Sequence, residues 1–206
     1  TENFIKSIYD GYTLNHNCDP TAFVDFNGMP RNLDRVKRKL AGAGIDITKP
    51  IIGVMGNNES CNMVRNMFGN KYQIVSIYQH TKAADYNFDY LTPFEWARIF
   101  SLFNVTVTKF FHGSMLSLKN GTPTIAIDYW SKVDSEHITK IEDLYKRLKL
   151  EDHYFYMPEV GHECEALRER LEYFIQRPDT EKIANGLANE SKAYDSFKDA
   201  LQKVLG

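Results

Sequence analysis

Short apolar segments alternate with amphipathic ones through the middle of the chain. Four segments are apolar throughout and short, which favours strands that are covered on both faces: residues 50–55, 72–78, 105–108 and 122–127. Between them, apolar residues recur at helical spacing, and the expected helices span residues 60–68, 93–103 and 112–119. Because strands that alternate with helices pair in parallel, we expect an α/β domain with a parallel sheet flanked by helices.

Helical patterns also occupy both flanks of this central block. Residues 31–41 predict a charged helix that Gly42 and Gly44 end, because glycine accepts the left-handed backbone of a helix C-terminus. The last third of the chain is expected to be helical, over residues 135–148, 163–174 and 180–204. Residues 1–30 have the character of a linker, so the main domain is expected to span residues 31–206.

Composition supports one globular unit. With 206 residues, of which 43% are hydrophobic, the chain can bury a core of its own. A net charge of −2, from 25 basic and 27 acidic residues, lacks the strong field of a nucleic-acid-binding protein, so no nucleic-acid partner is expected. The three cysteines form no CxxC pair and have no run of histidines nearby, so no metal is expected.

We expect neither an export signal nor a segment inserted in a membrane. No apolar stretch approaches the ~18–20 residues that a spanning helix needs, and the first residues lack the basic and apolar parts of a signal peptide. No transmembrane segment is therefore expected. The expected location is the cytoplasm, which includes the inner face of the membrane.

The most informative stretch follows the third predicted strand. In a parallel sheet, the carboxyl ends of the strands form the ligand crevice, and the next helix offers unpaired N–H groups and its positive dipole end to an anion. His112 lies at such a junction. Gly113 is expected to let a ligand approach the backbone there, and the Ser114 hydroxyl to add a hydrogen-bond donor.

Lys132 follows the next predicted strand. Because neighbouring parallel strands end at the same edge, Lys132 is expected to meet the anion that His112 faces. A histidine gives or takes a proton near pH 7, and a lysine supplies fixed positive charge. This combination suits chemistry on a phosphorylated carboxylic acid.

Residues 93–150 combine strand, helix, Phe-His-Gly-Ser, a short helix, Asn-Gly-Thr-Pro, strand and a downstream lysine. This block resembles the signature region of the polysaccharide pyruvyl transferase family. The turn at residues 19–21 resembles the family's linker between its two halves, and the terminal helix with Ser191 and Phe197 resembles its closing helix. The resemblance implies a Rossmann-like, donor-binding C-terminal lobe of a GT-B-type fold. It also implies that residues 1–30 contain the end of a preceding, N-terminal lobe.

The same resemblance implies a reaction. Phosphoenolpyruvate would be the donor substrate, with no further cofactor, and a glycan or lipid-linked sugar with two free hydroxyls would be the acceptor. The product would be a pyruvate ketal on a surface or extracellular polysaccharide. His112 matches the motif histidine, which implies acid/base catalysis, and Lys132 matches a downstream basic position, which implies binding of the donor phosphate or carboxylate.

One residue departs from the family pattern. Many members have an arginine two residues before the histidine, where this chain has Phe110. Lys109 is adjacent, but in an extended strand it points to the opposite face. Arg98, or Lys82 with His80 in the polar loop, is the expected substitute for the missing donor contact.

Each candidate also has a structural interpretation. His112 can be a helix cap, Lys132 a solvated lysine after a strand, and Ser114 an ordinary polar residue early in a helix. Residues 56–59 can be an ordinary connection rather than a phosphate-contacting loop. Besides a pyruvyl transferase, the sequence therefore leaves open the lobe of a nucleotide-sugar glycosyltransferase and a non-catalytic binding module.

Overall fold

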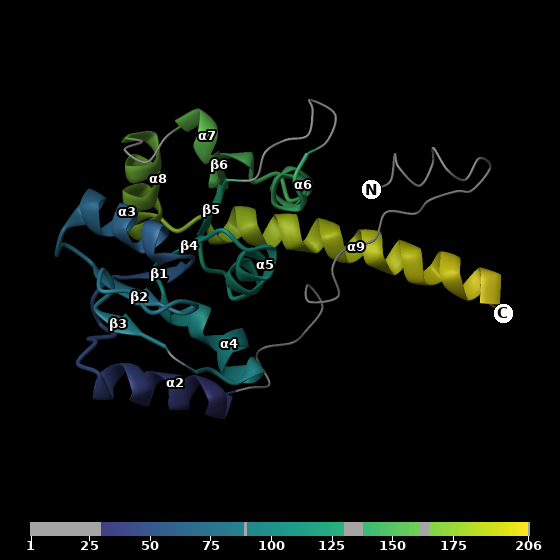
Figure 1. Ribbon diagram of the computed structural model, residues 1–206. Helices are drawn as coiled ribbons and strands as arrows, with labels where there is room; N and C mark the ends of the chain where they lie inside the picture. The colour runs from purple at the N-terminus through teal and green to yellow at the C-terminus, as the bar shows by residue number, and fades with distance from the viewer. Residues whose placement is uncertain (1–29, 89, 130–137, 161–164, 206) are drawn as a thin grey trace.

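The computed structural model describes residues 30–88, 90–129, 138–160 and 165–205. These residues form a six-stranded, wholly parallel sheet in the order β3-β2-β1-β4-β5-β6. The strands are β1 (Ile51–Met55), β2 (Gln73–Ser76), β3 (Tyr86–Asn87), β4 (Val105–Thr108), β5 (Thr124–Asp128) and β6 (Tyr154–Tyr156). The expected Rossmann-like α/β fold is thereby confirmed (Figure 1). Because the strand order reverses between β1 and β4, the crevice at their carboxyl ends is the expected ligand position.

Helices cover both faces of the sheet (Figure 1). In chain order they are α2 (Pro30–Gly42), α3 (Asn58–Phe68), α4 (Pro93–Ile99), α5 (Phe111–Lys119), α6 (Lys140–Arg147), α7 (Met157–Val160), α8 (Glu165–Gln176) and α9 (Thr180–Leu205). Short 3₁₀ turns follow α4 at Phe100–Leu102 and precede β6 at Glu151–His153. α3 and α8 bury one face of the sheet, whereas α4, α5 and α6 lie on the other, where α2 packs on α4.

The four predicted strands are all present, but two further strands were not predicted. β3 has two residues and β6 has three, and every residue in them is only half-buried. The last third of the chain is therefore not helical throughout, since β6 lies within it. The helix expected from residue 135 begins instead at Lys140, where the Thr139 side chain accepts a hydrogen bond from the backbone N–H of Glu142 at 3.1 Å.

The central strands are joined at their amino ends by one side chain. Asn104 precedes β4, and its Oδ1 accepts a hydrogen bond from the backbone N–H of Ile51 at 2.9 Å. The backbone N–H of Asn104 donates in turn to the carbonyl oxygen of Ile51 at 2.9 Å. These two bonds align β1 and β4, whose carboxyl ends flank the crevice.

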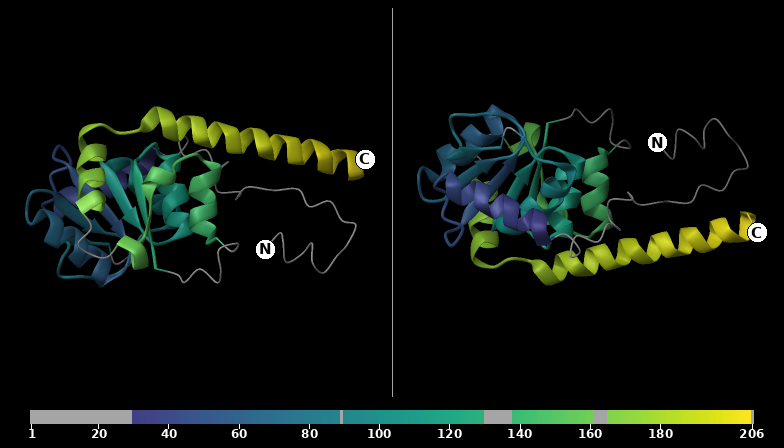
Figure 2. Two further views of the ribbon diagram at one scale, coloured as in Figure 1. Left: turned by 90° about the horizontal axis from the view of Figure 1, so that it is seen from above. Right: turned by 90° about the horizontal axis from the view of Figure 1, so that it is seen from below.

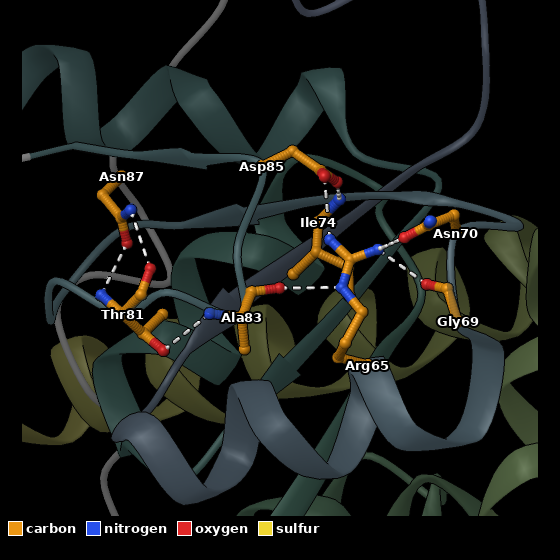
Figure 3. A network of polar contacts seen from close by, with 8 residues as sticks. All are labelled: Arg65, Gly69, Asn70, Ile74, Thr81, Ala83, Asp85 and Asn87. Atoms are coloured by element: carbon orange, nitrogen blue, oxygen red, sulfur yellow. Dashed lines mark hydrogen bonds and ion pairs between the residues drawn. The ribbon is translucent and has the colours of Figure 1, made fainter.

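Arg65, near the end of α3, organises the edge of the sheet at β3 (Figure 3). Its Nε donates to the carbonyl oxygen of Ala83 at 2.9 Å, and its Nη2 lies 2.8 Å from Asp85 Oδ1. The other carboxylate oxygen of Asp85 accepts from the backbone N–H of Ile74 at 2.7 Å. The segment that leads into β3 is thus held to α3 and β2 by polar contacts.

The C-terminal helix α9 continues well beyond the sheet (Figure 2). Near its start, Ile183 is buried against α6, and Gly186 lies so close to the end of α6 that an added Cβ would be 2.6 Å from the carbonyl oxygen of Leu148. Among the described helices, α9 included, none has a stretch long and apolar enough to cross a membrane.

Candidate active site

The candidate site is the turn between β4 and α5. Phe110 is the N-cap residue of α5, and its backbone N–H donates to Thr108 Oγ1 at 3.1 Å. The first helical hydrogen bond runs from the N–H of Ser114 to the Phe110 carbonyl at 3.0 Å. The Phe110 side chain makes no capping hydrogen bond with this end of α5. The helix therefore presents backbone N–H groups and its positive dipole end at the carboxyl edge of the sheet.

His112 lies in this first turn of α5 and is exposed. Its ring packs edge-on against Phe111, with the ring centroids 5.6 Å apart. The residue is therefore at the strand-to-helix junction that the sequence indicates, beside the point where the strand order reverses. An exposed imidazole in this position can exchange a proton with a ligand whose anionic groups bind at the helix terminus.

Gly113 is buried, and its position explains why the residue is a glycine. An added Cβ would lie 2.7 Å from the sulfur of Met55 and closer still to the hydroxyl of Thr108. The start of α5 is thus in direct contact with the ends of β1 and β4. The absent side chain faces the strands, so Gly113 is needed for packing between helix and sheet as well as for any backbone approach of a ligand.

Ser114 is fully buried. Its hydroxyl lies near that of Tyr145, whose pKa is raised by burial and lowered by the serine, with burial dominating. Neither hydroxyl has a hydrogen-bond partner of good geometry among the described residues. The structure therefore places the Ser114 side chain between α5 and α6, and not at the open edge beside His112.

Arg98 lies in the last turn of α4, and its Nη1 donates to Asn120 Oδ1 at 3.2 Å. Asn120 is the C-cap residue of α5, whereas His112 is in the first turn of the same helix. At 1.5 Å per residue, these two positions are about 12 Å apart. The structure thus holds Arg98 at the far end of α5 and does not bring it to His112.

The other predicted substitutes for the missing arginine lie after β2. His80 and Lys82 are both exposed, in the loop that begins at the carboxyl end of this strand. The loop thus starts at the same edge of the sheet as His112, but Lys82 directly precedes Ala83, whose carbonyl oxygen bonds to Arg65 near the end of α3. Lys132 lies outside the described residues.

An aromatic pair that was not predicted lies between these loops. The rings of Tyr78 and Phe110 are 4.5 Å apart and inclined at 59°. The ammonium group of Lys109 is 5.8 Å from the centroid of the Phe110 ring, and Tyr78 is 55% exposed. The position of Tyr78 at the end of the strand predicted over residues 72–78 was the available signal, because such residues collect at the carboxyl edge.

The end of β5 carries a buried carboxylate. Asp128 Oδ2 accepts hydrogen bonds from Thr139 Oγ1 at 2.5 Å and from the Tyr154 hydroxyl at 3.1 Å. Burial is the main cause that raises the pKa of Tyr154, followed by the charge of Asp128. The contacts join β5, the start of α6 and β6. The sequence signal for Asp128 was its position, because it is an acidic residue directly after an apolar run.

The turn after β1 is fixed by contacts within the protein. Asn57 Oδ1 accepts hydrogen bonds from the backbone N–H of Ser60 at 3.1 Å and from its hydroxyl at 2.9 Å. A Cβ on Gly56 would be 2.6 Å from the same hydroxyl. This geometry accounts for residues 56–59 as an N-capped connection to α3.

A cavity of about 270 Å³ lies at the opposite, amino edge of the sheet. Its lining includes Arg65, Gln73 and Asp85. The Gln73 side chain exchanges two hydrogen bonds of 2.8 Å with the backbone of Asp46, and Arg65 is paired with Asp85. These groups already bond one another, so they are not directed at a ligand.

The fold and the turn at His112 together define an α/β protein of the Rossmann-like class with a helix N-terminus at the carboxyl edge of its sheet. The sequence profile of the polysaccharide pyruvyl transferase family matches residues 16–131, which is more than half of the chain. The chain belongs to this family. The match includes the Phe-His-Gly-Ser block and ends one residue before Lys132.

Among solved structures, the chain is similar to the UDP-GlcNAc 2-epimerase from Neisseria meningitidis, a structure bound to UDP-GlcNAc. The TM-score is 0.50 and the sequence identity 11%, over 86% of this chain and 52% of that one. The chain thus spans about half the length of this structure, and the likeness concerns the fold alone. None of the curated proteins matches the sequence.

Proposed function

We propose that this chain is the donor-binding lobe of an enzyme that transfers pyruvyl groups from phosphoenolpyruvate to sugar hydroxyls of a surface or extracellular polysaccharide. The observation that carries the proposal is the exposed His112 in the first turn of α5, whose N-cap residue offers no side-chain hydrogen bond, at the crevice between β1 and β4 in a chain of this family. A second, N-terminal lobe would supply the acceptor side of the crevice.

In this proposal, the two anionic groups of phosphoenolpyruvate bind to the N–H groups of α5 and to Lys132. His112 delivers a proton to the methylene carbon, which makes the central carbon electrophilic, and a sugar hydroxyl adds to that carbon. The bond to phosphate then breaks and a second hydroxyl closes the ketal. Of the two protons that the hydroxyls release, one balances the proton on the new methyl group and the other leaves with phosphate.

A nucleotide-sugar site at the same strand ends is the second candidate. Two observations favour it: the similar epimerase binds UDP-GlcNAc, and the Tyr78–Phe110 pair offers an aromatic surface at this edge. In this case the acceptor or donor would be a nucleotide-activated sugar, and the N-terminus of α5 would bind its diphosphate.

Calorimetric titration of the chain with phosphoenolpyruvate and, separately, with UDP-GlcNAc tests both candidates. We expect phosphoenolpyruvate to bind, and His112→Ala and Lys132→Ala to weaken this binding, whereas Lys49→Ala, which removes an exposed lysine before β1, leaves it unchanged. Binding of UDP-GlcNAc alone would select the second candidate. If neither ligand binds even when an N-terminal lobe is supplied, the chain is a non-catalytic binding module.

A further inference from the structure

Three potential metal ligands converge at the amino edge of the sheet, away from His112. Asp152 and His153 immediately precede β6, and Asp179 immediately precedes α9. One ligand atom from each lies within 4.8 Å of the others. The ring of His153 reaches back to Thr124 at the start of β5, so the group joins the sheet to the beginning of α9.

The orientation of His153 fixes which nitrogen faces the two carboxylates. The side chain is fully buried, with the Phe174 ring 4.3 Å and the Tyr145 ring 6.4 Å from it, centroid to centroid. Its Nδ1 is 3.1 Å from the carbonyl oxygen of Thr124, which can only accept, so Nδ1 carries the hydrogen. In the neutral ring, Nε2 then presents a lone pair.

Nε2 has no hydrogen-bond partner among the described residues, yet it faces a carboxylate. It lies 3.6 Å from Asp179 Oδ2, which is too far for a hydrogen bond. Two ligands about 2.05 Å from a tetrahedral zinc ion are about 3.3 Å apart. The separation is thus close to that of neighbouring zinc ligands, and the Nδ1 contact to a backbone carbonyl is the usual support of a metal-bound histidine.

We propose that Asp152, His153 and Asp179 bind a Zn²⁺ ion. One imidazole nitrogen and two carboxylate oxygens are ligands that zinc accepts, and water completes the tetrahedral set. The ion would fasten the start of α9 to the amino ends of β5 and β6. Since this edge is opposite to the His112 turn, the site is structural and independent of the proposed transfer reaction.

Two side chains compete with the metal for Asp152. Arg170 Nη1 lies 3.0 Å from Asp152 Oδ2, and Lys182 Nζ lies 2.6 Å from Asp152 Oδ1. The Lys182 side chain is 42% exposed, so its ammonium group can turn into water when the ion enters. Arg170 can keep its contact with the second oxygen. Zinc binding is therefore expected to involve exchange with Lys182, which makes this lysine a sensitive probe.

The test uses the whole chain, stripped with a chelator and titrated with ZnCl₂, with calorimetry and the thermal unfolding midpoint as readouts. We expect Zn²⁺ to raise the unfolding temperature in a concentration-dependent manner. Asp179→Asn, which preserves shape, should abolish this shift. Lys182→Met should tighten zinc binding about tenfold, because it removes a positive charge close to the ion.

Matched variants on α9 control for general effects of charge. Asp199→Asn and Lys192→Met alter exposed residues farther along the helix and should bind Zn²⁺ like the unaltered chain. The proposal is overturned if Zn²⁺ produces no shift in either the unaltered chain or Lys182→Met. It is also overturned if Asp179→Asn binds the ion as tightly as the unaltered chain does, since the metal then occupies another site.

Discussion

The rings of Tyr78 and Phe110 pack against each other although their parent strands, β2 and β4, are not neighbours. β1 lies between those strands, so the aromatic pair spans the carboxyl end of the central strand. Phe110 also packs on the apolar cluster beneath α2 and α4. At the position where many family members have an arginine, this chain therefore makes an apolar contact between two loops of the site.

Replacing Phe110 by arginine should strengthen phosphoenolpyruvate binding several-fold. The guanidinium group would add a bidentate anion contact next to the N-terminus of α5. The variant should also unfold at a lower temperature, because the ring contact with Tyr78 is lost. Calorimetry measures the first effect and thermal unfolding the second. Phe110→Leu, which lacks the charge, separates them, and equal donor affinity in both variants would contradict a donor site at this turn.

Gly113→Ala should destabilise the fold by about 1–3 kcal/mol, because the new methyl group overlaps Met55 and Thr108. Gly42→Ala is the matched control, since the end of α2 has open space around this glycine. There the same change should be neutral or stabilising by up to about 1 kcal/mol. Urea unfolding measures both values. Similar changes in the free energy of unfolding for the two variants would show that the start of α5 does not pack directly against β1 and β4.

Glu95 should make the free energy of unfolding depend on pH. Burial acts to raise the pKa of Glu95, but the backbone N–H of Thr92 and the ammonium group of Lys39 outweigh it, and the pKa lies below 4.5. The carboxylate accepts from Thr92 at 2.8 Å and lies 3.0 Å from Lys39 Nζ and 3.1 Å from Arg35 Nε. The contribution of Glu95 to the free energy of unfolding is thus fully present above pH 4.5, and it is lost as the pH falls through the lowered pKa.

Glu95→Gln should accordingly lower the free energy of unfolding at pH 7 and reduce the further loss between pH 5 and pH 3. Urea titrations at several pH values test this expectation. The exposed Glu181→Gln on α9 controls for the change in net charge. If the free energy of unfolding of Glu95→Gln falls between pH 5 and pH 3 as much as that of the unaltered chain, other carboxylates cause the pH dependence.

Arg65→Lys should loosen β3 without disturbing the central strands. A lysine cannot reproduce the separate contacts of the guanidinium group with Ala83, Gly69 and Asp85. The backbone N–H groups of Asp85 and Phe88 bond to β2, and their hydrogen exchange should become at least several-fold faster. Exchange in β1 and β4 serves as the internal reference. Uniformly faster exchange would indicate global destabilisation instead.

The sequence was sufficient to predict the strands whose own side chains form the core. β1, β4 and β5 are fully buried, so their apolar runs are visible without knowledge of their neighbours. β3 and β6 differ, because their residues are half-buried and their pairing depends on distant groups such as Arg65. No local pattern encodes such contacts, and both strands were missed.

The same distinction applies to the candidate site. The turn at His112 was predictable, because the end of an apolar strand followed by a helix defines the edge of a parallel sheet. The location of Arg98 depends on the path of α4, which a linear sequence does not specify. His153 and Asp179 lie close together although 26 residues separate them in the sequence. No spacing motif indicates this contact.

The hydrogen bonds between Asn104 and Ile51 have a consequence for the kinetics of folding. They join residues 53 positions apart, and the intervening chain contains α3, β2, β3 and α4. Closing so long a loop costs entropy before the parallel pair gains any contact, so pairing of this kind is slow. The β1–β4 pair that borders the crevice is therefore expected to form more slowly than the contacts between elements that follow one another along the chain.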